Sequence, residues 1–374
     1  MNKSLLLSVL NNIVLKRLIL SFRFNRLPRE YNRTEYERNK KKWDTYSWDE
    51  MINIPYVLIG NGYLDLFQKH HKIRLIPREH LNRMLVNAIR SSIPNTIEIL
   101  KYIIDEIDTD RTILAGCHSR SGYNLLCYAA WFGKLEVFKY LEEIYKRQGI
   151  DMHYHQAIIK SPLSNSIEML EYVSKQLGTY SSTTETYASA AKVGRIDMIE
   201  WLDANRSEDF TLGNHMFESA VRENQLHVLE YLKRENRDTS VYEMTNLMDV
   251  AAEFGHIEVL KWLDFNNIGS CSKRAMDLAC KNGFDNIVIW LHNNRTEGCS
   301  TDAFDLACKN GFNNIVIWLH NNRTEGCTYR SMDYAAEGGF LEIVQFLNEN
   351  RNEGCSKFAM DNASLNGHFE VLNT

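Results

Sequence analysis

The sequence predicts an all-α solenoid in which short helix pairs of one repeated kind stack along the chain. Residues 277–300 read DLACKNGFDNIVIWLHNNRTEGCS and residues 305–328 read DLACKNGFNNIVIWLHNNRTEGCT, so two segments offset by 28 residues differ at two positions. The same spacing separates five glycines, Gly255, Gly283, Gly311, Gly339 and Gly367. A fixed period of this length is typical of repeat proteins. Only 5 prolines occur in 374 residues, which favours helices over loops.

Weaker copies extend the array toward the N-terminus. Three of them are marked by the residue at their central turn, Gly133, Gly194 and Asn224. Two others begin at Ala88 and Ala157 and carry insertions near the turn. Residues 60–67, GNGYLDLF, are taken as the first and most degenerate copy. We count about eleven units, whose regularity rises toward the C-terminus.

The first helix of each unit is expected to begin at a hydroxyl residue, because such a side chain accepts hydrogen bonds from the free N–H groups of a first turn. The four regular units have Ser272, Ser300, Thr328 and Ser356 at this place. Gly283 should end the helix, since the residue at that turn adopts a positive φ that glycine reaches freely. Met276, Leu278 and Ala279 are expected to share one apolar helix face.

The second helix carries an apolar core face, formed in one unit by Ile287, Val288, Trp290 and Leu291. An aromatic residue recurs in this helix, at Trp201, Trp262, Trp290, Trp318 and Phe346. We expect these rings to pack between units rather than to stack on nucleic-acid bases. One unit cannot bury its own core face, so the stacking of units creates the core.

These residues resemble an ankyrin repeat. The run LACKNGF that starts at Leu278, followed by Ile287-Val288 and Leu291, is similar to the family pattern L-A-A-x-x-G-H-x-x-x-V-x-x-L, and Gly255-His256 keeps the Gly-His pair. The likeness covers roughly residues 51–374 and is strong from Ala188 onward. Among ankyrin proteins, the repeats resemble the W-L-x-x-N-R subtype of large expanded families.

Two departures from the family pattern change the expected fold. The T-P-L-H opening is replaced by residues such as Arg274-Ala275-Met276-Asp277, and the period is 28 residues instead of about 33. The missing residues fall between the second helix and the next first helix, where the family has a protruding β-hairpin. A short turn at residues 294–298 takes that place, so we expect the hairpins to be reduced or absent.

The chain is expected to divide into three parts. Residues 1–50 should form an N-terminal helical cap and a charged linker, residues 51–187 degenerate ankyrin-like repeats, and residues 188–374 regular repeats of which the last is truncated. An F-box-like adaptor-docking helix and an interfacial membrane helix stay open as alternatives for residues 1–50. No window reaches the ~20 apolar residues that span a bilayer, and no cleavable secretory signal is present, so we expect a cytoplasmic protein.

The motifs argue against an enzyme. No P-loop, H-E-x-x-H, G-x-S-x-G or paired C-x-x-C motif occurs, and no cofactor is expected. The net charge of −5 disfavours general nucleic-acid binding. Four cysteines recur at the repeat spacing, Cys271, Cys299, Cys327 and Cys355. Equivalent positions in stacked helices lie ~8–10 Å apart, too far for a disulfide or a shared zinc ion, so we expect buried packing residues and no metal site.

The expected function is protein–protein interaction on the concave face of the array. The two residues between the small pair and the turn glycine project there in each unit. Eight of them are candidate contacts, Trp131, Phe132, Arg222, Glu253, Phe254, Lys281, Lys309 and Glu337. The aromatic members would be anchors, because aromatic residues dominate interface energetics, or would instead pack under neighbouring turns.

These observations together predict a monomeric, non-enzymatic scaffold for an unknown protein partner, with neither nucleic acid nor membrane as a ligand. Two alternatives stay open. The chain could act as an adaptor that recruits a partner through the N-terminal helix. It could also belong to an expanded repeat family and retain little function, as the nearly identical copies at residues 277–328 allow.

Overall fold

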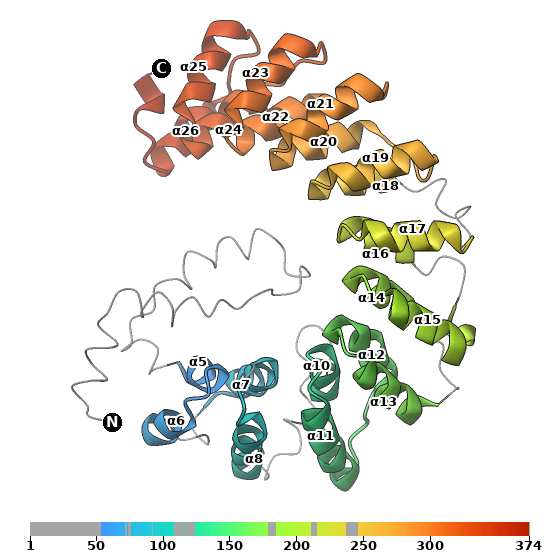
Figure 1. Ribbon diagram of the computed structural model, residues 1–374. Coiled ribbons are helices and arrows are strands. Elements are labelled where there is room, and N and C mark those ends of the chain that lie inside the picture. Colours follow the sequence, from blue (N-terminus) through green and yellow to red (C-terminus); the bar gives the residue numbers. More distant parts are fainter. Residues whose placement is uncertain are drawn as a thin grey trace, which may run out of the picture. The chain divides into compact units, whose positions relative to one another are not determined.

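The computed structural model describes residues 54–71, 73, 76–91, 93–107, 114, 124–178, 185–210, 215–236 and 246–373. Within these residues every regular element is a helix and no strand occurs. The chain divides into two compact units, Met1–Leu125 with Glu143–Ile150, and Leu126–Glu142 with Asp151–Thr374. Successive helices pack against their neighbours inside each unit (Figure 1), which confirms the predicted helical repeat architecture.

The described part of the first unit contains helices α5 (Pro55–Gly60), α6 (Leu64–His70), α7 (Arg78–Arg90) and α8 (Thr96–Ile107). They form two pairs, α5 with α6 and α7 with α8, and α5 also packs on α7. The turn of the first pair contains Gly62 at φ +79°, inside the segment predicted as the first repeat. Leu58, Phe67 and Leu85 are fully buried between these helices.

Helix pairs continue from residue 125 to residue 350, and one further first helix follows them. The first helices are α10 (Leu125–Trp131), α12 (Tyr154–Lys160), α14 (Glu185–Val193), α16 (Met216–Arg222), α18 (Leu247–Phe254), α20 (Lys273–Asn282), α22 (Thr301–Lys309), α24 (Arg330–Gly338) and α26 (Lys357–Leu365). The second helices are α11 (Leu135–Gln148), α13 (Ile167–Leu177), α15 (Ile196–Asn205), α17 (Leu226–Arg234), α19 (Ile257–Asn266), α21 (Asp285–Asn294), α23 (Asn313–Asn322) and α25 (Leu341–Asn350). The 3-10 turns are η2 (Ser161–Ser164), η3 (Ser207–Asp209) and η5 (Val371–Asn373).

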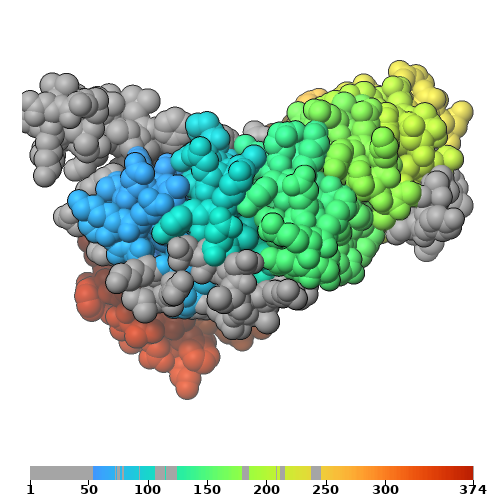
Figure 2. Space-filling view, turned by 90° about the horizontal axis from the view of Figure 1, so that it is seen from below, coloured from blue at the N-terminus to red at the C-terminus, as the bar shows by residue number. Residues whose placement is uncertain are grey.

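Like helices of neighbouring repeats lie side by side in the second unit. From α12 onward, the first helix of each pair packs against the first helix of the next. The first helices α18 to α26 form one row and the second helices α19 to α25 form another (Figure 1). Figure 2 shows the repeats from α12 to α17 as one continuous surface.

A glycine and an aromatic ring of the next repeat fix the turn inside each regular pair. Gly283 has φ +78°, as predicted, and Asn224 adopts φ +59° in a weaker copy. A Cβ atom on Gly283 would lie 2.6 Å from the ring of Phe312, which follows the turn glycine of the next repeat. Glycine is therefore required at this turn both for its backbone conformation and for the space that it leaves.

A buried aspartate links each regular repeat to the next. Asp277 in α20 accepts hydrogen bonds from the backbone N–H (2.8 Å) and the hydroxyl (2.7 Å) of Ser300, which precedes α22. The Ser300 hydroxyl accepts from the N–H of Asp302 at 3.2 Å, so the predicted N-cap is confirmed. The same contacts join Asp249 to Ser272, Asp305 to Thr328, and Asp333 to Ser356. We call these four contacts the aspartate ladder.

The ladder places carboxylates inside the solenoid. Asp305 is 2% exposed and accepts a third hydrogen bond from the Ser331 hydroxyl, at 2.6 Å. Burial raises the pKa of Asp277, against the opposing effect of its two hydrogen bonds from Ser300. A carboxylate can be buried only where such donors replace its water, so each aspartate depends on the hydroxyl residue of the next repeat.

The core follows the predicted apolar faces with one difference on the first helix. Met276, Ala279, Ile287, Val288 and Leu291 are buried. Leu278, by contrast, is half-buried. It stands three residues before the exposed Lys281 and therefore shares the outer side of α20 with it.

Two other packing predictions hold only in part. Trp318 is half-buried and lies edge-to-face with His292 of the preceding repeat at a centroid distance of 5.1 Å, and Phe346 lies in the same way on His320 at 5.3 Å, so these two rings pack between units. Cys299 and Cys327 are buried, beneath Arg323 and Arg351 of the following loops. The prediction of burial was wrong for Cys355. This cysteine is exposed, and no arginine of a following loop covers it among the described residues. Cys271 is of intermediate exposure.

The last described repeat differs from those before it. After Gly367 the chain forms η5 in place of a second α-helix. Met360, Leu365 and Phe369 are exposed at 65%, 84% and 67%. Residues 1–50, predicted as a helical cap and charged linker, lie outside the described residues.

The ladder predicts a large effect for Asp305→Ala. The change leaves the Thr328 N–H and two hydroxyls without their acceptor in a buried place, so the free energy of unfolding should fall by about 3 kcal/mol. Asp302→Ala, an exposed site on the same helix, is the control and should cost less than about 1 kcal/mol. Urea unfolding, with hydrogen exchange of residues 328–332, measures both. Equal losses for the two variants would show that the buried carboxylate does not link the repeats.

Candidate binding surface

In seven of the repeats, one side chain projects from the end of the first helix, two positions before the turn residue. We call this set the edge row: Trp131, Lys192, Arg222, Glu253, Lys281, Lys309 and Glu337. Six of its members were predicted contact residues. Lys281, Lys309 and Glu337 are exposed, whereas Arg222 and Glu253 are half-buried.

The backbone of the edge row is held in place by the following repeat. The carbonyl oxygen of Lys281 accepts a hydrogen bond from the Asn310 side chain at 2.9 Å, and that of Glu253 accepts one from Asn282 at 3.0 Å. Equivalent contacts reach the carbonyl groups of Lys192 from Gln225, Arg222 from His256, and Glu337 from Asn366. Five of the seven edge-row residues therefore project from a backbone whose carbonyl group is held by the next repeat.

The predicted aromatic anchors in α10 and its turn already contact other side chains of the protein. Trp131 is half-buried, with its ring near-parallel to Tyr128 and to Phe132 at centroid distances of 6.3 and 5.9 Å. The ammonium group of Lys160, only 7% exposed, lies 5.0 Å from the centre of the Trp131 ring. Trp131 and Phe132 thus contribute to the packing of α10 as well as to its surface.

Phe254 is engaged in a similar way. The guanidinium carbon of Arg222 lies 5.0 Å from the centre of its ring, and the ring stacks on His256 at 6.2 Å. Arg222 also forms an ion pair with Glu218 at 2.9 Å. The structure therefore brings the predicted pair Arg222 and Phe254 together across two repeats, and ties both to the fold.

A second row of the same surface was missed by the sequence analysis. Val250, Leu278, Leu306 and Tyr334 are half-buried and occupy equivalent places in consecutive first helices; we call them the apolar stripe. Each lies three residues before an edge-row residue, so the two rows are neighbours on one helix face. The ammonium group of Lys309 lies 4.6 Å from the centre of the Tyr334 ring. The 28-residue offset applied to Leu278 would have revealed the stripe.

The first helices of residues 246–373 carry charges of both signs, and their cations are unpaired. Six cations of these helices make no ion pair in this part of the chain, Lys273, Arg274, Lys281, Lys309, Arg330 and Lys357. The second helices here hold one lysine, Lys261, which pairs with Glu258 at 2.9 Å. The first-helix face is thus the side on which cations remain available to an acidic ligand.

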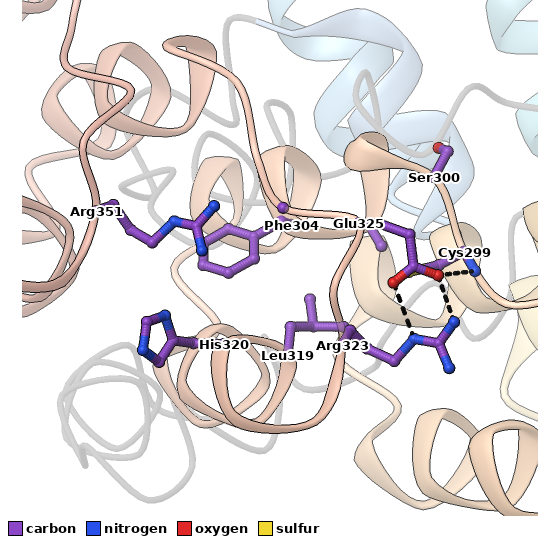
Figure 3. A pocket seen from close by; sticks show the side chains of 10 residues that line it. Cys299, Ser300, Phe304, Leu319, His320, Arg323, Glu325 and Arg351 are labelled. Carbon is purple, nitrogen blue, oxygen red and sulfur yellow. Dashed lines mark hydrogen bonds and ion pairs between the residues drawn. The ribbon is translucent and has the colours of Figure 1, made fainter.

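A small pocket near the loops is lined by side chains that contact one another (Figure 3). Its volume is about 10 Å³, room for about one water molecule. Arg323 and Glu325 form a two-point ion pair, with 3.1 Å between Nε and Oε2, and the Cys299 N–H donates to the same carboxylate at 3.3 Å. Arg351 covers the ring of Phe304 at 5.7 Å. The Arg323–Glu325 ion pair is repeated as Arg295–Glu297 and Arg351–Glu353. We call these three ion pairs the loop staples, because they hold each loop to the repeat before it.

Other charged groups in the interior are also structural. Glu142 is 3% exposed and accepts hydrogen bonds from the hydroxyls of Tyr154 and Tyr172. Arg206 and Asp209 form a buried ion pair at 2.6 Å, and Arg206 donates to the Gly178 carbonyl at 2.8 Å. Among the described residues, no group of three or more His, Cys, Asp or Glu side chains could hold a metal ion. None of the described helices is both long and apolar enough to cross a bilayer.

Glu325 makes the loop staples sensitive to acid. Burial favours a higher pKa, but the hydrogen bonds from Arg323 and from the Cys299 N–H outweigh it and lower the pKa to about 2. A carboxylate whose pKa is lower in the folded than in the unfolded chain stabilises the fold above its unfolded pKa. That contribution is lost as the pH falls from about 4.5 to about 2.

Glu325→Gln should therefore flatten the acid dependence of stability. Between pH 4.5 and pH 2, the variant should lose about 1–2 kcal/mol less unfolding free energy than the unmodified chain, after allowance for solvent screening. Urea unfolding across this pH range gives the measurement. Glu349→Gln, at an exposed site on α25, is the control and should keep the original slope. A slope unchanged by Glu325→Gln would contradict the role given to this staple.

Comparison with known proteins adds no family to this geometry, because neither a scan of protein-family models nor a search of curated proteins finds a match.

Proposed function

We propose that the protein is a non-enzymatic scaffold that binds another protein along its first-helix face. The observation that carries the proposal is the edge row. Its exposed side chains at Lys281, Lys309 and Glu337 contribute nothing to the core, yet the next repeat fixes the backbone from which Lys281 and Glu337 project.

Such an arrangement suits recognition because binding costs less when the contacting groups are already ordered. A loop that must be fixed on binding reduces affinity by its lost freedom, whereas a row on packed helices does not. The half-buried apolar stripe beside the edge row supplies area that a partner can cover. The two rows together offer charge for selectivity and apolar surface for affinity.

We further propose that the repeats are of a short ankyrin-like type. Three features support this: the L-A-x-x-x-G pattern of the first helix, the left-handed turn at Gly283 with φ +78°, and the return of a second helix after it. Between residues 246 and 373 the repeats are joined by irregular segments with no strand. This is expected if the 28-residue repeat lacks the residues that form the β-hairpin in a longer repeat.

The scaffold proposal predicts that partner capture depends on the edge row. The triple variant Lys281→Ala, Lys309→Ala, Glu337→Ala alters only exposed side chains, so its unfolding free energy should change by less than about 1 kcal/mol. It should nevertheless lose the proteins that the intact full-length chain captures in proximity labelling and pull-down.

A matched triple variant on the second helices, Asp285→Ala, Asn321→Ala, Glu349→Ala, alters equally exposed sites and should keep those proteins. Equal capture by the two triple variants would exclude the first-helix face as the binding surface.

A further inference from the structure

We propose, building on the scaffold function above, that the first-helix face around Lys281 of α20 and Lys309 of α22 binds an extended, polyproline II-like segment of a partner protein that carries two acidic side chains three residues apart. The argument uses the charges of the edge row, the apolar stripe beside it and the spacing of the repeats.

The centre of the edge row selects negative charge. Lys281 and Lys309 are neighbours in consecutive repeats, both are exposed, and neither forms an ion pair in residues 246–373. Glu253 precedes them and Glu337 follows them. A short acidic segment meets two cations there, whereas a long polyanion such as a nucleic acid would also meet the two carboxylates. The charge order therefore favours a peptide with few, spaced acidic residues.

The apolar stripe determines which kind of residue must neighbour each acidic residue of the bound segment. Leu278 and Leu306 are half-buried, each three residues before its lysine and on the same helix face. Tyr334 continues the stripe under the ammonium group of Lys309, at 4.6 Å. An apolar partner residue next to each acidic one would cover this stripe while its carboxylate reaches the lysine.

The repeat spacing selects the conformation of the bound segment. Adjacent packed helices stand ~8–10 Å apart. A polyproline II segment has three residues per turn and a rise of ~3.1 Å, so every third side chain points the same way at intervals of ~9.3 Å. In a β-strand, residues three apart point to opposite faces. A polyproline II segment therefore presents two carboxylates, three residues apart, on one side toward Lys281 and Lys309.

The surface needs little rearrangement to accept such a segment. Asn310 fixes the backbone carbonyl of Lys281 at 2.9 Å, and Asn282 fixes that of Glu253 at 3.0 Å. The backbone at these two edge-row residues is thereby held in place before any ligand binds. A ligand with the matching period gains all its contacts at once, which is the basis for discrimination against other spacings.

The test uses fluorescein-labelled peptides and the full chain in fluorescence anisotropy titrations. The probe is a peptide with two consecutive Glu-Pro-Leu triplets between uncharged Ser-Pro-Leu triplets, compared with a peptide of the same composition whose two glutamates stand two residues apart. The unmodified chain should bind the triplet probe at least about tenfold more tightly than the control peptide, and the affinity should fall as salt is raised.

Charge reversal then tests the assigned lysines. Lys281→Glu with Lys309→Glu should weaken binding of the Glu-Pro-Leu probe at least about tenfold and create binding of a Lys-Pro-Leu counterpart. Lys261→Glu, on a second helix, should leave both affinities within about twofold. Circular dichroism checks that each variant keeps its helices.

Three outcomes would overturn the inference. No binding of the acidic probe by a chain whose partner capture still depends on the edge row would refute the ligand chemistry and leave the scaffold function intact. Equal affinity for both glutamate spacings would refute the three-residue period. Tighter binding of a single-stranded oligonucleotide than of the peptide would assign the cations to nucleic acid.

Discussion

The buried aspartate of each regular first helix is the contact on which this part of the solenoid depends. A helix N-terminus needs acceptors for its free N–H groups, and a buried carboxylate needs donors. The hydroxyl of Ser300 meets both needs, since it donates to Asp277 and accepts from the N–H of Asp302. Because the two partners stand 23 residues apart in different repeats, one helix is fully capped only when the repeat before it is folded.

The same coupling fixes the binding surface. The aspartate ladder holds the N-terminal ends of the first helices, and side chains such as Asn282 and Asn310 hold their C-terminal ends. First helices fixed at both ends keep their register, so the edge row and the apolar stripe run in parallel at the spacing of the repeats. Under the proposed function, this spacing would make binding depend on the period of a ligand as well as on its charge, and so would connect the packing of the array with recognition.

Features that depend on local chemistry were predictable from the sequence. The period, the hydroxyl caps such as Ser300 and the left-handed glycine turns follow from residues close together in the chain, and the structure has them. The aspartate ladder was not predicted, although Asp249, Asp277, Asp305 and Asp333 recur at the repeat spacing. An aspartate in a helix ordinarily faces solvent, and only the stacked fold brings Asp277 within 2.8 Å of Ser300.

The exposure of the candidate surface was predictable in outline only. The exposed edge-row residues Lys281, Lys309 and Glu337 lie where the repeat pattern indicated. The sequence left open whether Phe254 is a surface anchor or packs within the array, and in the structure a cation from another repeat covers its ring at 5.0 Å. Leu278 was placed on the apolar face of the first helix. Helical periodicity does not distinguish the edge of that face from its middle, because the neighbouring repeat decides which of its residues are buried. Contacts between repeats, rather than patterns within one repeat, decided each of these differences.

A double-mutant cycle between Asp277 and Ser300 tests the coupling of the repeats most directly. Asp277→Ala, Ser300→Ala and the double variant are compared by urea unfolding, so that effects of each residue on its own helix cancel. The ladder predicts an interaction energy of at least about 1 kcal/mol between the two positions, since each side chain leaves the other unpaired when removed. Additive losses, with an interaction energy near zero, would contradict the account that this contact joins one repeat to the next.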